Sequence, residues 1–109
     1  MKSLFSEKQL CNQIIEFLNY QGAYCWRTNA GMLPIESNGR SRMVRIGNAG
    51  TSDIIGIYNG RFIALEVKKP ETRKRVTEKQ TEFLATIKQH GGIAAVVTSP
   101  EEALMAIKG

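Results

Sequence analysis

Two carboxylates of this sequence, Asp53 and Glu66, stand in segments that are predicted to pair as neighbouring β-strands. These segments, residues 53–58 and 61–69, are rich in β-branched and aromatic side chains. Asn59-Gly60 between them is the dipeptide most typical of a two-residue hairpin turn. Such a turn pairs Asp53 with Glu66 directly across the hairpin, with their Cβ atoms about 4.5–5.5 Å apart on one face of the sheet.

This pairing is destabilising unless a cation lies between the carboxylates, because like charges placed opposite each other repel. Lys68 projects from the same face as Glu66, so an ion pair between them is one alternative explanation, and solvation of both carboxylates at the strand ends is another. Apolar side chains on both faces of the strands argue against solvation: Ile63, Leu65 and Val67 on one face, and Ile55, Ile57, Phe62 and Ala64 on the other. We therefore expect a divalent-metal site, and hard oxygen ligands favour Mg²⁺ or Mn²⁺ over zinc.

The other elements follow from hydrophobic periodicity and from capping and turn residues. Helices are expected over residues 4–20 and 77–90 and from Ser99 onward, with Ser3 or Ser6 capping the first and a Ser99–Glu102 capping box on the last. Further strands are expected over residues 23–29 and 93–98, together with a flap-like hairpin formed by Leu33–Glu36 and Arg42–Ile46. The order is α-β-(hairpin)-β-β-α-β-α. The helix between 61–69 and 93–98 makes those strands parallel, which predicts an α/β fold with a mixed sheet flanked by helices.

Helical phase selects two further polar residues. At 100° per residue, Glu7 lies within about 20° of the inward-facing Leu18, whereas Glu16 lies on the opposite, polar face with Asn12 and Asn19. In the second helix, Gln80 shares an apolar stripe with Val76, Phe83 and Ile87. Gln80 also follows Thr77 by three residues, so the pattern fits a capping box and a functional site equally well.

Charge and rare residues narrow the classes of function. Fifteen lysines and arginines against ten carboxylates give a net charge of +5, which favours a polyanionic partner such as nucleic acid. The only histidine, His90, falls at a predicted helix end, which disfavours triads and histidine-rich metal sites. Cys11 and Cys25 fit apolar patterns and are expected to be reduced core residues. No apolar run approaches the roughly 18 residues of a membrane span, and the N-terminus does not resemble a secretory signal, so we expect a cytoplasmic protein with no membrane partner.

Nearly the whole chain resembles the virus-type replication-repair nuclease (VRR-NUC) domain, a family of the PD-(D/E)xK nuclease superfamily. The resemblance lies in Glu7, Arg27-Thr28-Asn29-Ala30-Gly31, Gly50-Thr51-Ser52-Asp53-Ile54, Glu66-Val67-Lys68-Lys69 and Gln80. Ser52 stands where the superfamily pattern has proline, a position at which this family often varies. The resemblance implies a restriction-endonuclease-like core, with residues 1–109 forming one domain similar to the stand-alone minimal members found mostly in phages and prophages.

The resemblance implies a metal-dependent DNA endonuclease that leaves 5′-phosphate and 3′-hydroxyl ends. One or two Mg²⁺ or Mn²⁺ ions per active site and no organic cofactor are expected. Stand-alone members resemble Holliday-junction resolvases and act as homodimers, so resolution of four-way junctions by a homodimer is the leading expectation. Flap cutting, nicking or restriction-like cleavage on the same core is one alternative, and a catalytically inactive DNA-binding protein is another. A small-molecule phosphatase or a metal-binding module would fit the carboxylates but leaves the basic surface unexplained.

Roles for individual residues also follow from the resemblance. Asp53, Glu66 and the backbone carbonyl of Val67 are expected to hold the metal, with Glu7 contributing directly or through water. Lys68 is expected to orient the attacking water and stabilise developing charge, and Gln80 to position water or phosphate. Phosphate contacts, which place DNA without reading its sequence, are expected from Arg27, Asn29, Arg40, Arg42, Arg45, Lys69, Arg73, Lys74 and Arg75.

Two apolar surfaces are candidates for the dimer contact. One comprises Met32, Leu33 and Ile35 in the flap-like hairpin, and the other comprises Leu104, Met105 and Ile107 in the C-terminal helix. Trp26 is expected in the core or at an interface rather than stacked on a base.

Overall fold

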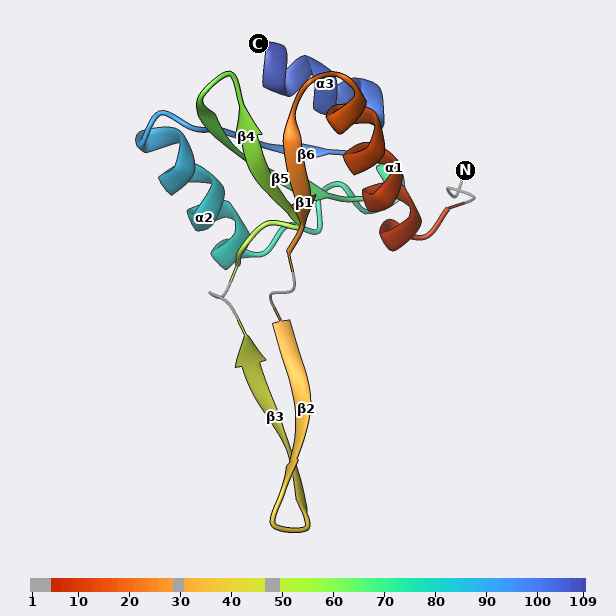
Figure 1. The fold of residues 1–109 in the computed structure, drawn as a ribbon, viewed down its shortest axis with the longest axis vertical. Helices are drawn as coiled ribbons and strands as arrows, with labels where there is room; N and C mark the ends of the chain where they lie inside the picture. Colours follow the sequence, from red (N-terminus) through yellow and green to blue (C-terminus); the bar gives the residue numbers. More distant parts are fainter. Residues whose placement is uncertain (1–4, 29–30, 47–49) are drawn as a thin grey trace.

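A computed structural model describes residues 5–28, 31–46 and 50–109, and of residues 31–34 and 44–46 it describes the backbone alone. Within these residues helices and strands alternate along the chain (Figure 1). Their bounds are α1 Glu7–Tyr20, β1 Tyr24–Arg27, β2 Gly31–Ser37, β3 Arg40–Ile46, β4 Ile54–Tyr58, β5 Arg61–Val67, the 3-10 turn η1 Pro70–Thr72, α2 Glu78–Gln89, β6 Ile93–Val97 and α3 Pro100–Lys108.

Four of the strands form a mixed sheet in the order β1-β4-β5-β6, and β2 and β3 form a separate two-stranded hairpin. Strands β1, β4 and β5 are antiparallel neighbours, whereas β6 runs parallel to β5. The parallel pair is joined through α2, as a crossover between parallel strands requires. The predicted α/β class and the predicted order of elements are confirmed.

The β4–β5 hairpin has the predicted register. Asn59 and Gly60 have φ of 50° and 76°, the positive values that a two-residue hairpin turn demands. Tyr58 pairs with Arg61, and the ladder continues to Ile54 opposite Leu65. The next positions along the two strands are Asp53 and Glu66, so the register brings the two carboxylates to the same end of the sheet.

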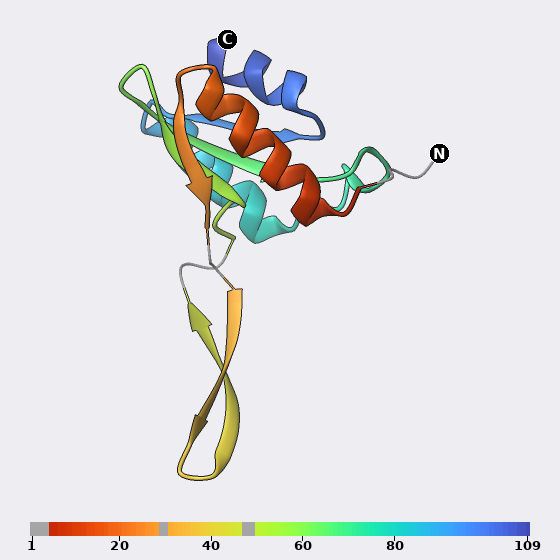
Figure 2. The same cartoon turned by 45° about the vertical axis from the view of Figure 1, so that its right-hand side comes forward.

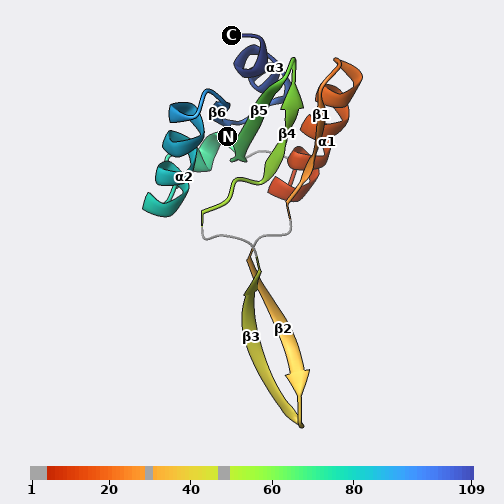
Figure 3. The same ribbon diagram turned by 60° about the vertical axis from the view of Figure 1, so that its left-hand side comes forward.

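Helices cover the two faces of the sheet unequally. Figure 3 shows α1 and α2 on opposite sides of it. On the first face, α1 and α3 pack against a core whose fully buried members include Ile14, Leu18, Ile54, Ile63 and Leu65. On the second face, α2 packs on β5 and β6, where Ala64, Leu84 and Ala94 form a smaller buried cluster.

The second face stays open over β1, β4 and the start of β5. Tyr24, Trp26, Ile57 and Phe62 are 73%, 44%, 51% and 40% exposed there. The expectation that both faces are covered is therefore right at Ala64, which is fully buried, and wrong at Ile57 and Phe62. Trp26 therefore does not lie in the core, so that half of its prediction is wrong, and its location at an interface stays a prediction.

The β2–β3 hairpin extends away from the four-stranded sheet (Figures 1 and 2). Its turn is made by Asn38 and Gly39, with φ of 51° and 72°. Arg42 pairs with Ile35 and Arg40 pairs with Ser37, so both arginines lie near the exposed tip. The predicted flap-like hairpin is confirmed, with strands that are longer than expected.

Capping residues set the helix ends. Ser6 accepts from the backbone N–H of Gln9 (3.1 Å), and the Gln9 side chain accepts from that of Ser6 (2.9 Å), so α1 begins at Glu7. Ser3 lies outside the described residues. Ser99 caps α3, but the predicted capping box is wrong because the Glu102 carboxylate accepts from the Thr98 N–H (2.8 Å) instead of that of Ser99.

Asn19, Leu104 and Ile107 make contacts that the sequence does not predict. Asn19 is exposed on α1 as expected, and its side chain bridges the backbone N–H and C=O of Cys25, at 2.8 and 3.1 Å. Leu104 and Ile107 pack on the core, which leaves only Met105, 74% exposed, for a contact through α3. Cys11 and Cys25 are buried free thiols, as predicted.

Among the described residues we find no helix of the length and apolarity that crossing a membrane demands.

Candidate active site

Asp53 and Glu66 meet at the end of β4 and β5. Glu66 is only 2% exposed, and Asp53 stands immediately before β4. The Asp53 Oδ2 atom accepts a 2.7 Å hydrogen bond from the backbone N–H of Val67, the residue after Glu66. The Asp53 carboxylate is thus bonded to the backbone of β5, next to the carboxylate of Glu66.

The segment before Asp53 is held by contacts that the sequence analysis did not identify. Ser52 is fully buried, and its hydroxyl donates to the carbonyl oxygen of Ile54 (3.2 Å). Thr28, just after β1, donates from its hydroxyl to the Ser52 carbonyl and from its N–H to the Asp53 carbonyl, both at 2.8 Å. These bonds anchor the Asp53 backbone to β1. The only sequence signal for them is that both residues lie within the segments that resemble the VRR-NUC domain.

The Glu66 carboxylate is partnered on one oxygen only. Its Oε2 accepts from the Gln80 amide (3.0 Å) and lies 3.8 Å from the ammonium of Lys68. Its Oε1 is buried and has no hydrogen-bond partner among the described residues. A buried carboxylate oxygen without a donor is unfavourable and rare, so this oxygen is available to a cation.

Burial raises the pKa of Glu66 to about 8, and the neighbouring Asp53 charge adds to this shift. Lys68 opposes the shift. The negative charge of the Glu66 carboxylate is therefore unfavourable in this site unless a cation binds beside it.

We expect the metal-free protein to lose stability as the pH rises from about 4.5 to about 8. In that window the folded state retains the Glu66 proton whereas the unfolded state has released it, so raising the pH favours unfolding. Each unit of difference between the folded-state and unfolded-state pKa changes the free energy of unfolding by about 1.4 kcal/mol. Urea unfolding in EDTA across this window would measure the slope, and Glu66→Gln should flatten it while Glu16→Gln, at an exposed position, should not. A wild-type protein equally stable at both ends of the window would contradict the prediction.

Gln80 completes the predicted capping box and also contacts Glu66 at the candidate site. Its side-chain oxygen accepts from the Thr77 N–H (2.8 Å), and its own N–H donates to the Thr77 hydroxyl (3.1 Å), which completes the capping box of α2. Its side-chain nitrogen donates to Glu66. The first turn of α2 and the buried carboxylate are therefore joined through one side chain.

Gly50 packs against that same turn. Its φ is +81°, and an added Cβ would stand 2.4 Å from the carbonyl oxygen of Lys79 and 3.0 Å from the nitrogen of Gln80. These are backbone atoms of a capped helix, so they have little freedom to move. The chain that leads from the β2–β3 hairpin to Asp53 thus contacts the residue that holds Glu66.

Gly50→Ala is expected to destabilise the protein by more than about 2 kcal/mol, because a left-handed backbone conformation is combined with a backbone clash. Gly60→Ala is a matched control, since Gly60 has φ +76° but nothing within 4 Å of the added Cβ. Urea unfolding of both variants would separate the clash from the conformational penalty. Equal losses of stability in the two variants would show that the Gly50 contact is unimportant.

Glu7 reaches the site from α1, as its helical phase predicted. It lines a small cavity of about 50 Å³ together with Lys8, Cys11, Arg27, Asp53 and Val67. This volume is comparable with one or two water molecules at about 30 Å³ each. Burial, with a smaller contribution from Asp53, raises the pKa of Cys11 to about 11, so this wall of the cavity carries a neutral thiol.

The donor set fits a hard divalent cation. It offers carboxylate oxygens from Asp53 and from the neighbouring Glu66, and Glu7 lines the same cavity as Asp53. Within the described ranges, no three histidine, cysteine, aspartate or glutamate side chains converge as a preformed cluster. The fit therefore rests on the unpartnered Glu66 oxygen beside a second carboxylate, and not on a complete ligand cage.

The basic residues predicted to contact DNA are unequally available. Arg27, Arg40, Arg42, Lys74 and Arg75 are exposed. Lys69 pairs with Glu71 (3.8 Å), and Arg73 bonds to Thr98 (3.1 Å) and forms an ion pair with Glu102. Asn29 lies outside the described residues, and Arg45 belongs to a segment described by its backbone alone.

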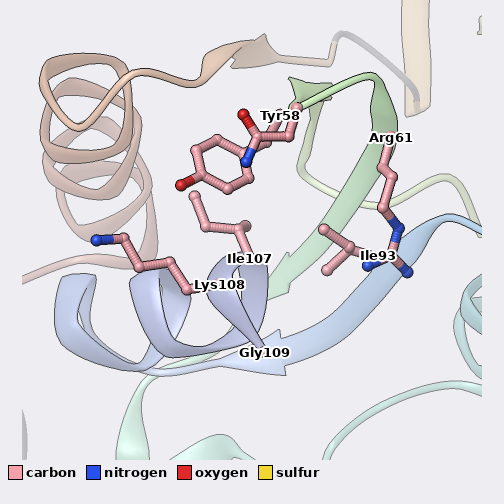
Figure 4. A pocket seen from close by; sticks show the side chains of 7 residues that line it. Tyr58, Arg61, Ile93, Ile107, Lys108 and Gly109 are labelled. Carbon is pink, nitrogen blue, oxygen red and sulfur yellow. The ribbon is translucent and has the colours of Figure 1, made fainter.

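A larger hollow of about 400 Å³ lies by the β4–β5 turn and the end of α3. Figure 4 shows the side chains around it, among them Tyr58, Arg61 and Lys108. No carboxylate side chain lines this hollow, and the β4–β5 turn is at the opposite end of the strands from Asp53 and Glu66. The smaller cavity, and not this hollow, is therefore the candidate active site.

A family model agrees with the geometry of this site. The model of the VRR-NUC domain matches residues 6–101, and the chain belongs to that family, a nuclease family with a PD-(D/E)xK-like fold. No curated protein matches the chain. Membership indicates a nuclease, and nucleases of this type usually use divalent metals and act on DNA.

Proposed function

We propose that the whole chain is one nuclease domain that hydrolyses phosphodiester bonds of branched DNA with the help of Mg²⁺ or Mn²⁺, and that as a homodimer it resolves four-way junctions. The observation that carries the proposal is the buried Glu66 carboxylate, which stands beside Asp53 with one oxygen unpartnered among the described residues. Family membership supports the reaction class.

Asp53, Glu66 and the Val67 carbonyl would hold one or two metal ions, with Glu7 contributing directly or through water. When bound, such an ion lowers the pKa of a coordinated water and stabilises charge on the scissile phosphate. The Asp53 carboxylate is oriented for this role by its bond from the Val67 N–H, and Glu66 by its bond from Gln80.

Lys68 supplies a fixed positive charge beside Glu66. Its side chain is 13% exposed, so its interaction with an anionic phosphate is screened less than at an open surface. We assign to Lys68 the orientation of the attacking water and the stabilisation of charge in the transition state. Gln80 keeps Glu66 in place and is available to water or phosphate only if it releases that carboxylate.

DNA would approach along the exposed arginines that flank the site. Arg27 lines the small cavity, and Arg40 and Arg42 lie on the projecting hairpin. Lys74 and Arg75 precede α2 on the other side. Arg73 and Lys69 are held by carboxylates and would contribute after exchanging those partners. Asn29 and Arg45 remain proposed contacts.

A homodimer would present two such sites to two strands of a junction. The hairpin is the better of the two surfaces proposed for it. Ile35 and Met43 are exposed there at 37% and 56%, and an isolated two-stranded hairpin is only marginally stable in water. The α3 surface offers Met105 alone.

The function is tested by cleavage of a labelled immobile four-way junction beside a flap and a plain duplex of matched sequence. Each substrate is incubated with Mg²⁺, Mn²⁺ or EDTA. Paired symmetric incisions of the junction alone, absent in EDTA, are expected. Cutting of the flap or duplex instead would retain the chemistry and reject junction resolution. Tight DNA binding without any cutting would identify a DNA-binding protein and overturn the catalytic assignment.

A further inference from the structure

Two cations from different elements line the small cavity that contains Asp53. Lys8 lies in the first turn of α1, and Arg27 is the last residue of β1. Side chains alternate along a strand, so Arg27 projects from the same face as Cys25, which belongs to the core that α1 covers. The charge of Arg27 also opposes the rise in the pKa of the Cys11 thiol in this cavity. Both cations therefore lie on the α1 side of the candidate site.

Neither of these cations is held by a carboxylate of the described part of the chain. The ion pairs found there are those of Lys68, Lys69 and Arg73, and Lys8 and Arg27 are both exposed. A lysine in the first turn of a helix is unfavourable in addition, because the positive end of the helix dipole lies there. The two side chains are thus available to an anion from outside the chain.

The cavity is too small and too acidic to admit a nucleotide. Glu7 and Asp53 place two carboxylates on its wall, and its volume of about 50 Å³ is comparable with one or two water molecules at about 30 Å³ each. A hydrated cation fits this space, whereas a phosphodiester must lie at its mouth. At the mouth, the exposed Lys8 and Arg27 side chains offset the repulsion between the carboxylates and an approaching phosphate.

A third cation lies on the other side of the carboxylates. Lys68 stands 3.8 Å from Glu66, and Glu66 is bonded by Gln80 from α2, so this cation belongs to the α2 side of the site. Lys68 is assigned above to the charge of the transition state. A DNA strand that passes from Lys68 across the carboxylates would bring its next phosphate to Lys8 and Arg27.

We propose that Lys8 and Arg27 together bind one phosphate of the DNA backbone, the phosphate next to the cleaved one, at the mouth of the cavity. Arg27 offers a planar fork of N–H donors that suits two phosphate oxygens, and Lys8 adds a point charge. This inference rests on the proposed nuclease function and adds Lys8 to its substrate contacts. Phosphate contacts position a strand without reading its sequence, so this pair sets the register of the strand over the metal site in each protomer.

Anisotropy of a labelled four-way junction in EDTA measures this contact without cleavage. Lys8→Gln and Arg27→Gln are each expected to weaken binding by about 5-fold, as for one exposed charge contact. The slope of log affinity against log salt should fall by about 0.9 in the double variant, the value for one phosphate. An unchanged slope would overturn the proposal, and a fall of about 1.8 would mean two separate phosphates and overturn the shared site.

Two further variants control this measurement. Lys8→Arg keeps the positive charge and should bind like the wild type, which guards against a folding defect at the first turn of α1. Lys108→Gln removes a lysine from the last turn of α3, by the hollow at the opposite end of the strands, and should leave the slope unchanged. Equal losses in Lys8→Gln and Lys108→Gln would show a general effect of net charge and overturn the site.

Neutral methylphosphonate groups, placed one at a time along the strand, locate the phosphate. At the contacted position the wild type and Lys108→Gln should lose affinity by about 5-fold, whereas the double variant of Lys8 and Arg27 should lose none. This position should adjoin the bond that is cleaved in Mg²⁺. A position remote from that bond, or no such position, would overturn the proposal.

The two proposals fail in different ways. Metal-dependent cleavage of branched DNA by a protein whose binding does not depend on Lys8 would overturn the phosphate site and leave the nuclease function standing. Loss of the contact at one phosphate in the double variant, without cleavage in any metal, would overturn the nuclease function and leave a phosphate-binding site of a DNA-binding protein.

Discussion

Asp53→Asn is expected to lower the cleavage rate more than 100-fold and, in the absence of metal, to raise the midpoint of thermal unfolding. Loss of even an outer partner of a metal ligand lowers metal affinity or activity by about 10- to 100-fold, and Asp53 is proposed as a ligand itself. The gain in stability follows because its charge contributes to the raised pKa of the buried Glu66. The asparagine oxygen can still accept the hydrogen bond from Val67.

Cleavage assays in Mg²⁺ and thermal melts in EDTA at pH 8 measure the two effects on the same variant. Glu16→Gln is a suitable control because it removes one carboxylate from an exposed position of α1. A variant that loses cleavage and also loses stability in EDTA would mean that Asp53 is mainly a structural residue. The proposed metal site would then lack its main support.

Lys68→Ala should lower the rate of the chemical step by about 100- to 1,000-fold, the usual effect of removing one group that stabilises transition-state charge. Metal binding should persist, because Lys68 is not a proposed ligand and competes with the metal for Glu66, 3.8 Å away. Single-turnover cleavage and calorimetric Mg²⁺ titration together separate these effects.

The neighbouring Lys69 provides the control for Lys68. It has the same side chain, but it pairs with Glu71 and lies outside the candidate site. We expect Lys69→Ala to change DNA affinity slightly and the rate of the chemical step very little. If both lysine variants reduced cleavage equally, the effect would be on DNA binding, and the assigned role of Lys68 would be wrong.

Local interactions explain why the sequence predicts so much of the framework. The Asn59-Gly60 turn determines its own register because its backbone conformation suits those two residues, and the register alone places Asp53 opposite Glu66. The periodicity of α1 likewise predicts that Glu7 turns inward, and the cavity that it shares with Asp53 is consistent with that prediction. These features depend on residues close together in the chain.

Features that depend on distant segments were predicted incompletely. Gln80 fits two roles in the sequence because a capping box is a local pattern, whereas its contact with Glu66 exists only after α2 has packed on β5. Because the side chains of Phe62 and Ile57 are apolar, the sequence predicts that other parts of the chain cover them. Coverage depends instead on where α2 packs: it lies on β5 and β6, where it leaves Ile57 of β4 and Phe62 at the start of β5 exposed and Ala64 of β5 buried.

The sequence by itself therefore determined the nuclease family, the α/β order of elements and the pairing of the two carboxylates, since motif, periodicity and turn are properties of the chain. Only the tertiary structure decided that one Glu66 oxygen is buried without a partner among the described residues, that Gly50 abuts the first turn of α2, and that Trp26 is exposed. Burial and close packing arise from elements far apart in sequence, and no local pattern encodes which of them meet.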